Sequence, residues 1–416
     1  MINTPKSLRI QIALFGRVNV GKSSFLNMIA NQDVAITSPI PGTTTDVVEK
    51  SMELLPIGPV TFLDTAGLDD KSELAEKRIE RTLKILNRAN VAVIVAEYSQ
   101  WTDFERELIN ILNKKNIPFL IAFNKIDIAK TDKQIIPNEL KNLEKQILFC
   151  SSIDILNRNQ YVNKFKDILL DILPQELLTD KTLVRDLIPE NATVILIIPI
   201  DKEAPKGRLI LPQVQTIRDI LDGNSTAIML KETEYVKTLN NLKKKPDLVI
   251  CDSQVVDFMV ENTPTDIACT TFSILFSRYK GDLSQEIIGA AALSTLKPFD
   301  KVLIAEACSH HPNEDDIGRV KIPKWMKMYL GHKVQIDVFS GRDYPDDLNK
   351  YKVIIHCGGC MLTRNEKLRR IEMAVEYKVP ITNYGIAISL FKGVLERVLQ
   401  PFKEEYEIFK TLTKHY

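Results

Sequence analysis

The sequence predicts an α/β protein of three successive domains, and three observations support this. Short apolar segments rich in Val, Ile and Leu alternate with amphipathic segments along most of the 416 residues, as in parallel sheets whose strands are joined by helices. A glycine-rich loop follows the first apolar segment, and cysteines follow two of the last ones. We therefore expect a P-loop domain over residues 1–175, a small α/β connector over 180–280 and a metal-binding α/β domain over 281–416.

The composition is that of an ordinary globular protein. Hydrophobic residues make up 44% and charged residues 26%, and the formal net charge of +1 gives no support for a nucleic-acid partner. The longest apolar runs are too short to span a bilayer, and the N-terminus lacks the apolar core of a signal peptide. We therefore expect a cytoplasmic protein without a membrane partner, in which six cysteines indicate metal binding or burial rather than disulfides.

The first domain begins with a strand that leads into a phosphate-binding loop. The run GRVNVGKSS, residues 16–24, has the Gly-x4-Gly-Lys-Ser pattern in its required place between an apolar strand and a helix. Backbone N–H groups of such a loop wrap the phosphates, while Lys22 reaches the β- and γ-phosphates and Ser23 binds Mg²⁺. The residues expected to contact the phosphates are Gly16, Asn19, Val20, Gly21, Lys22, Ser23 and Ser24.

Two further motifs follow in the order that a guanine-nucleotide site requires. A strand-like segment ends in Asp64-Thr-Ala-Gly67, where Asp64 is expected to hold Mg²⁺ through water and Gly67 to sense the γ-phosphate. A second buried segment ends in an Asn-Lys-x-Asp motif, whose aspartate accepts two N–H groups that guanine has and adenine lacks. A Ser-Ser pair is a looser match to the last base-contacting loop. The residues expected to contact the base are Asn124, Lys125, Asp127, Ser151 and Ser152.

Around these motifs the domain resembles the G domains of the TrmE–Era group of GTPases. The run Pro41-Gly-Thr-Thr44-Thr-Asp46 resembles their switch I, which by position makes Thr44 a Mg²⁺ ligand. Leu68 stands where a Ras-like enzyme has its water-orienting glutamine. The resemblance implies that a K⁺ ion held by Asn19 replaces an arginine finger, and that GTP hydrolysis is slow and stimulated by K⁺. A purely loop-shaping role for Asn19 stays open.

Four residues therefore have expected catalytic roles: Asn19, Lys22, Thr44 and Gly67. The residue that orients the attacking water is not identified, because Asp69, Asp70 and Glu73 all follow the Asp-x-x-Gly motif. The expected cofactors of this domain are GTP or GDP, Mg²⁺ and K⁺.

Residues 180–280 repeat the strand–helix rhythm without any catalytic constellation. Because a sheet this small gains from pairing with a second copy, we assign this region to dimerisation and expect a homodimer or a higher homo-oligomer. Cys251 and Cys269 lie in or beside strands and are expected to be small core residues, and Cys150 is given no role.

Three cysteines follow two strands of the C-terminal domain. The segment 301–307 runs into Cys308-Ser-His310-His-Pro, and the segment 353–356, which ends in His356, runs into Cys357-Gly-Gly-Cys360. The carboxyl ends of such strands share one rim, so we expect these thiols to meet there. From the ligands alone, Cys3His zinc and an iron–sulfur cluster are equally open, and a redox Cys-x-x-Cys leaves Cys308 unexplained. His310 and His356 are candidates for a fourth ligand or for hydrogen bonds to the ligands.

The whole arrangement resembles the HydF-type maturation GTPases of iron–iron hydrogenases. The resemblance rests on the potassium-type G domain, the small middle domain and the Cys-x-His…His-Cys-x-x-Cys pattern, and it covers essentially all of the chain. It implies a 4Fe-4S cluster on Cys308, Cys357 and Cys360 with an exchangeable fourth site. A carboxylate of the middle domain is the fourth ligand in some relatives, for which Asp186 is our candidate.

That resemblance also implies a role and partners. The protein would be a scaffold and carrier that receives a two-iron precursor made with two radical-SAM maturases and delivers it to apo-hydrogenase. The alternative is an RNA-directed GTPase, for tRNA modification or ribosome assembly, with a structural zinc site. The balanced charge counts against that alternative. A GTP-gated iron transporter would need a membrane span, which the sequence does not predict.

Overall fold

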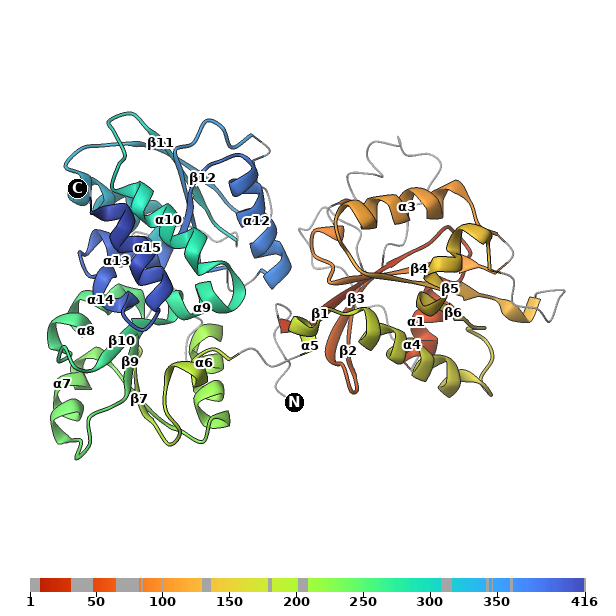
Figure 1. Ribbon diagram of the computed structural model, residues 1–416, viewed down its shortest axis with the longest axis horizontal. Coiled ribbons are helices and arrows are strands. Elements are labelled where there is room, and N and C mark those ends of the chain that lie inside the picture. The colour runs from red at the N-terminus through yellow and green to blue at the C-terminus, as the bar shows by residue number, and fades with distance from the viewer. Residues whose placement is uncertain are drawn as a thin grey trace. The chain divides into compact units, whose positions relative to one another are not determined.

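The computed structural model (Figure 1) describes residues 8–30, 48–64, 82–83, 85–98, 100–128, 136–178, 182–200, 209–307, 316–341, 344–345, 347–359 and 362–414. The chain divides into two compact units, Met1–Asp180 and Lys181–Tyr416. None of the helices within the described ranges has the length and apolar character needed to cross a membrane.

The first unit is built on a six-stranded sheet with the strand order β2-β3-β1-β4-β5-β6. The strand β2 runs antiparallel to β3, and every other neighbouring pair is parallel. The strands β1, β4 and β5 are buried over almost their whole length, because apolar clusters cover both faces of the sheet. The elements are β1 (Ile10–Phe15), α1 (Lys22–Ala30), β2 (Val48–Leu54), β3 (Gly58–Asp64), β4 (Val91–Glu97), α3 (Asp103–Lys114), β5 (Phe119–Asn124), β6 (Ile147–Phe149), α4 (Arg158–Ile172) and α5 (Gln175–Leu178).

The second unit contains two four-stranded parallel sheets. The first has the order β10-β9-β7-β8 and the second the order β12-β11-β13-β14. The elements of the first half are β7 (Thr193–Ile197), α6 (Leu211–Asp222), β8 (Thr226–Leu230), α7 (Glu232–Asn241), β9 (Leu248–Cys251), α8 (Val256–Asn262), β10 (Ala268–Thr271) and α9 (Phe272–Lys280). Those of the second half are α10 (Leu283–Leu293), β11 (Lys301–Ala305), α11 (Ile322–Leu330), β12 (Gln335–Phe339), β13 (Val353–His356), α12 (Arg364–Glu376), β14 (Ile381–Asn383), α13 (Tyr384–Phe391), α14 (Leu395–Leu399) and α15 (Lys403–Thr413).

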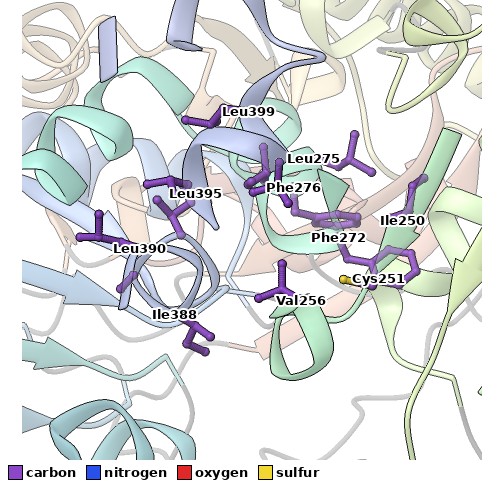
Figure 2. Packing of buried hydrophobic residues seen from close by; sticks show 14 of the residues in the cluster. Ile250, Cys251, Val256, Phe272, Leu275, Phe276, Ile388, Leu390, Leu395 and Leu399 are labelled. Carbon is purple, nitrogen blue, oxygen red and sulfur yellow. The ribbon is translucent and has the colours of Figure 1, made fainter. Parts of the chain in front are cut away.

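The two sheets of the second unit share one hydrophobic cluster, which extends from Leu183 to Phe409. Figure 2 shows side chains of α9, α13 and α14 within it, with Cys251 among them. Cys251 and Cys269 are fully buried in this cluster, and burial raises the pKa of both thiols, for Cys269 to about 11. The regions 180–280 and 281–416 therefore share a core, although their sequence patterns suggest two separate domains.

A glycine sets the distance between α10 and the second sheet. A Cβ atom on Gly289 would lie 2.0 Å from the carbonyl oxygen of Ile381 in β14, so only glycine lets the helix backbone approach the strand this closely. The apolar pattern of the sequence predicts α10 and the strands β11, β12 and β13, but it does not identify β14. The sequence also predicts one C-terminal helix around residues 386–402. This prediction is wrong, because Gly393 has a φ of 72° and separates α13 from α14.

Candidate functional site

The phosphate-binding loop joins the end of β1 to the start of α1. Gly16, Asn19 and Gly21 have φ angles of 154°, 65° and 91°, a region that glycine and asparagine tolerate best. A Cβ on Gly16 would lie 2.2 Å from the carbonyl oxygen of Val95, and one on Gly21 would lie 2.4 Å from Nδ2 of Asn124. The two glycines therefore let the loop pack against β4 and against the base motif.

The lysine and serines of the loop lie where a phosphate group would need them. The ammonium of Lys22 donates to the carbonyl of Gly16 and, at 3.0 Å, to that of Arg17, so it lies over the loop. Ser23 and Ser24 are exposed in the first turn of α1, which carries no acidic residue. The positive end of the helix dipole is thus available to an anion.

Asn124 connects the phosphate loop to the last base-contacting loop. It is buried at the end of β5, and its Nδ2 donates to the carbonyl of Val20 at 3.0 Å. Its Oδ1 accepts from the backbone N and the hydroxyl of Ser152 at 3.0 and 2.9 Å. Three segments far apart in the sequence, residues 16–24, 124–127 and 151–152, are therefore held together by one amide side chain.

Two further observations fit a guanine base at this place. The hydroxyl of Ser151 is buried and has no hydrogen-bond partner among the described residues. Asp127 is exposed in the short helix Ile126–Ile128, where its carboxylate is accessible to a ligand. Lys125 has a φ of 64° and pairs with Glu97 at 3.0 Å. The residues present therefore suit a guanine nucleotide, although Thr44 and Gly67 lie outside the part of the chain that the structure describes.

Asp64 occupies the position expected of a residue that holds Mg²⁺ through water. It is buried at the end of β3 and is paired in register with Leu14 of β1, which lies just before the phosphate loop. Ser23, the other described Mg²⁺ candidate, follows that loop. Both residues are thus presented at the carboxyl edge of the same sheet.

The candidate metal centre lies at the carboxyl ends of β11 and β13, which are neighbouring parallel strands with Ala305 opposite His356. The backbone N–H of Cys357 donates to the carbonyl of Ala305 at 2.9 Å, and the backbone N–H of Ala307 donates to Sγ of Cys357 at 3.0 Å. Cys308, His310 and Cys360 fall outside the described ranges, within which no group of metal-ligating side chains occurs. The meeting of all three thiols stays a prediction.

His356 uses both of its ring nitrogens in contacts with the protein. Its Nδ1 lies 2.5 Å from the carbonyl oxygen of Cys357, and its Nε2 lies 2.9 Å from a guanidinium nitrogen of Arg370. Burial and the nearby charge of Arg370 lower the pKa of His356 to about 3, so the ring is neutral and donates through Nδ1. These contacts match the hydrogen-bonding alternative, because a ligand role would require breaking one of them.

A buried ion pair supports the loop that follows Cys357. Lys367 and Glu286 are both almost fully buried and lie 2.8 Å apart, and Glu286 also accepts from Ser277 at 2.6 Å and from Asn383. The stem of Lys367 passes beneath Gly359, which has a φ of 66°. The cysteine loop is therefore seated on a charged side chain whose position is fixed.

Asp186, the candidate ligand from the middle region, pairs with Arg278. Its two carboxylate oxygens accept from the guanidinium at 2.6 and 2.8 Å. Burial would raise the pKa of Asp186, but the hydrogen bonds and charge of Arg278 lower it below its usual value. Arg278 thus occupies one acceptor site on each oxygen of Asp186, and the ligand role of Asp186 stays a prediction.

Glu105 is a residue of the nucleotide site that the sequence reasoning missed. This fully buried carboxylate of α3 pairs with Arg17 of the phosphate loop at 2.8 Å. The signal in the sequence is the Thr-x-x-Glu pattern at Thr102, which marks a helix start. That pattern does not reveal the second partner, which comes from a distant loop.

Three family models match successive parts of the chain. Residues 11–125 match a model described as 50S ribosome-binding GTPase. Residues 183–281 match the hydrogen maturase F dimerization domain, and residues 284–401 match the hydrogen maturase F tetramerization domain.

Individual curated relatives match part of the chain. A tRNA modification GTPase MnmE of Prochlorococcus marinus (strain NATL1A) is 43% identical over 121 residues, which are 29% of this chain and 26% of that protein. The GTPase Der of a Nitratiruptor species is 33% identical over 172 residues, 40% of this chain and 36% of the relative. The chain thus spans only a minor part of the length of these curated relatives.

Among solved structures, the Era protein of Aquifex aeolicus bound to GDP and AlF4⁻ is 22% identical, with a TM-score of 0.32. The match covers 55% of this chain and 97% of that one. The expectation of a TrmE–Era-like G domain followed by two α/β regions is confirmed by the family models and sheets. Because the two hydrogen maturase F models together cover more than half of the residues, the chain belongs to the hydrogen maturase F (HydF) family, with a P-loop GTPase domain at its start.

Proposed function

We propose that this protein is a GTP-hydrolysing scaffold and carrier in the assembly of the active-site cluster of iron–iron hydrogenases. It holds a 4Fe-4S cluster on Cys308, Cys357 and Cys360, receives a two-iron precursor made with two radical-SAM maturases and delivers it to apo-hydrogenase. It acts in the cytoplasm as a homo-oligomer, for which the dimerization and tetramerization domains supply the interfaces. The family membership and the geometry of the strand ends support this function.

The hydrogen bond from the N–H of Ala307 to Sγ of Cys357 is the observation that carries the proposal. Cys308 follows Ala307 directly, so its Cα is about 3.8 Å from that of Ala307. Cys360 is three residues beyond Cys357, which limits the separation of their Cα atoms to about 11 Å. These chain lengths are compatible with a common site for the three thiols, and an N–H donor to a ligating sulfur is a known means of tuning iron–sulfur clusters.

The protein's own groups prepare Cys357 to bind a metal. The N–H of Ala307 donates to Sγ of Cys357 and so fixes the position of that sulfur at the end of β13. His356 donates to the carbonyl of Cys357 and is itself held by Arg370, while Lys367 supports the loop that follows Cys357. A 4Fe-4S cluster bound by three thiolates supplies one iron with an exchangeable position, at which cargo attaches.

The GTPase domain provides the switch. Lys22 stabilises the charge on the phosphates, Ser23 and Thr44 bind Mg²⁺, and Asn19 helps to hold K⁺. We infer slow, K⁺-stimulated hydrolysis, because Leu68 stands where a Ras-like enzyme has its water-orienting glutamine.

Anaerobic reconstitution with iron and sulfide tests the cluster. The native protein is expected to bind about four irons and to give a reducible 4Fe-4S signal by electron paramagnetic resonance. Cys357→Ala should lose both, whereas Cys269→Ala should keep them, because that thiol is buried in the core and stays protonated. After co-expression with the two other maturases, only the native protein and Cys269→Ala should activate apo-hydrogenase.

Stoichiometric zinc without a 4Fe-4S signal would refute the cluster proposal and favour the RNA-directed alternative. A normal cluster signal without activation of apo-hydrogenase would leave the cluster intact and refute the carrier role.

A further inference from the structure

One short segment of the first unit contacts both halves of the nucleotide site. It runs from Glu97 at the end of β4 to Glu105 in the first turn of α3. On the base side, Glu97 pairs with Lys125 of the Asn-Lys-x-Asp motif at 3.0 Å, and the N–H of Tyr98 donates to the carbonyl of Asn124 at 3.0 Å. The segment is therefore bound to the residues that are expected to read guanine.

On the phosphate side, the same segment binds the phosphate loop through Arg17. The guanidinium donates to the side chain and the carbonyl of Gln100 at 3.1 and 3.0 Å. Its Nε donates to Oε1 of Glu105 at 2.8 Å. The other oxygen of Glu105 accepts from the backbone N of Thr102 at 2.9 Å and from its hydroxyl at 2.5 Å. One carboxylate thus joins the phosphate loop to the start of α3.

The burial of this carboxylate makes the connection stiff. The side chain of Glu105 is 0% exposed, whereas that of Arg17 is 24% exposed. A buried charge that loses a hydrogen-bonded partner is strongly disfavoured, so the phosphate loop and the start of α3 cannot separate freely. If the phosphate loop or the start of α3 moves, the other must move with it, or the charge-assisted hydrogen bond between Arg17 and Glu105 must break.

We propose that Arg17 and Glu105 are positioning residues that couple the phosphate loop to the turn before α3, so that nucleotide binding alters this turn. The pair acts on the loop backbone and makes no contact with the reacting atoms. The inference rests on the nucleotide-binding part of the proposed function and is independent of the iron–sulfur part.

Trp101 offers a direct measurement, because it lies in the coupled turn and its ring is 5.6 Å from that of Phe123 in β5. The chain has two tryptophans, and the other, Trp325, belongs to α11 of the second unit. A Trp325→Phe background therefore leaves Trp101 as the only tryptophan, which can be excited selectively at wavelengths that tyrosine does not absorb. Binding of GDP or of a non-hydrolysable GTP analogue with Mg²⁺ is expected to change its emission.

The test compares Arg17→Gln, Arg17→Lys and Glu105→Gln in that background. Arg17→Gln and Glu105→Gln should lose most of the nucleotide-induced change in emission and release fluorescent GDP about ten-fold faster, the factor that about 1.4 kcal/mol produces. Arg17→Lys keeps the charge facing Glu105 and should restore part of both. Glu139→Gln is the matched control, because it breaks an exposed ion pair with Arg106 of the same helix and should change neither.

Several outcomes would overturn the coupling. The coupling is refuted if the parent binds fluorescent GDP but its Trp101 emission does not change. It is also refuted if Arg17→Gln shows the same nucleotide-induced change in emission as the parent. Arg17→Gln and Arg17→Lys could lose the change in emission and speed up GDP release equally, in proportion to their lowered melting temperatures. That result would show that the pair only stabilises the fold. If Glu105→Gln fails to fold, the partly exposed Arg17 variants decide the question. Failure of the parent to bind any guanine nucleotide would instead refute the nucleotide site itself.

Discussion

Asn19 is an exposed polar residue of the phosphate loop. It has a φ of 65°, a conformation that asparagine tolerates better than most residues. Its side-chain oxygen is thus presented at the surface of the loop, which suits a ligand of a monovalent cation.

We expect Asn19→Ala to lose the stimulation of GTP hydrolysis by K⁺, because the variant lacks the side-chain oxygen that would hold the ion. The rate of phosphate release should be higher in KCl than in NaCl for the native protein. For the variant, the two rates should be equal. Asn116→Ala is the control, since Asn116 also has a positive φ, 51°, and lies after α3. A K⁺ response that survives in Asn19→Ala would assign this residue to loop shape alone.

For single residues, the sequence predicts the roles of those that belong to one continuous motif. It does not predict contacts between residues that are far apart in the chain. Lys22 and Asn124 were predictable because each follows or ends a strand that fixes its place. The contacts of His356 with Arg370 and of Glu105 with Arg17 were not, since each joins segments that only the folded sheet brings together. A buried histidine beside a cysteine suggests a ligand until its partners are known.

The edge strand β8 is the element that best explains how the middle region pairs with a second copy. It is terminal in its sheet, and two of its five residues are exposed, including Met229 at 53%. Thr226 donates to Ala192, and Leu230 accepts from Ile198, so the main-chain groups of alternate residues face β7. Those of Met229 therefore face outward, where an open edge can pair with another strand.

We expect Met229→Pro to weaken the dimer, because proline removes an outward N–H while leaving the bonds to β7 intact. Light scattering after size-exclusion chromatography over a range of concentrations should show the loss of one association step. Met229→Ala removes the side chain but keeps the N–H, and it should assemble as the native protein does. Unchanged assembly of Met229→Pro would move the interface away from this edge.

Many strands were predictable from their apolar runs, whereas the helices α3, α7, α11 and α15 went unrecognised. Two of these helices bury very little, since Tyr235 is the only buried residue in the described span of α7 and Phe409 the only one in that of α15. A weak apolar stripe gives little signal in the sequence. The break at Gly393 was missed for the opposite reason. Both flanking helices, α13 and α14, are so apolar that their sequence suggests one continuous helix.

The second unit as a whole is held together by a core that its two halves share. Phe272 and Leu275 from the first half belong to the same cluster as Ile388 and Leu395 from the second. Full burial of such a side chain stabilises by about 1.5–3 kcal/mol, and a whole domain is stable by only about 5–15 kcal/mol. Exposing a few of them would therefore remove most of the stability of either half.

We expect residues 181–416 to melt in one cooperative transition and residues 181–281 alone to show none, as measured by circular dichroism. Residues 1–180 have their own apolar clusters and should melt cooperatively by themselves. A cooperative transition in 181–281 would show that the dimerization region folds without its neighbour and that the shared cluster is not required. Sequence patterns could not anticipate this, because they mark strands and helices but not which of them share a core.

The hydrogen bond to the sulfur of Cys357 comes from the main chain of Ala307, and this determines how it responds to mutation. Every standard amino acid except proline would keep the donor at position 307, because proline alone lacks a backbone N–H. This hydrogen bond therefore depends on the path of the backbone and not on the side chain at position 307, so any substitution there other than proline keeps the donor.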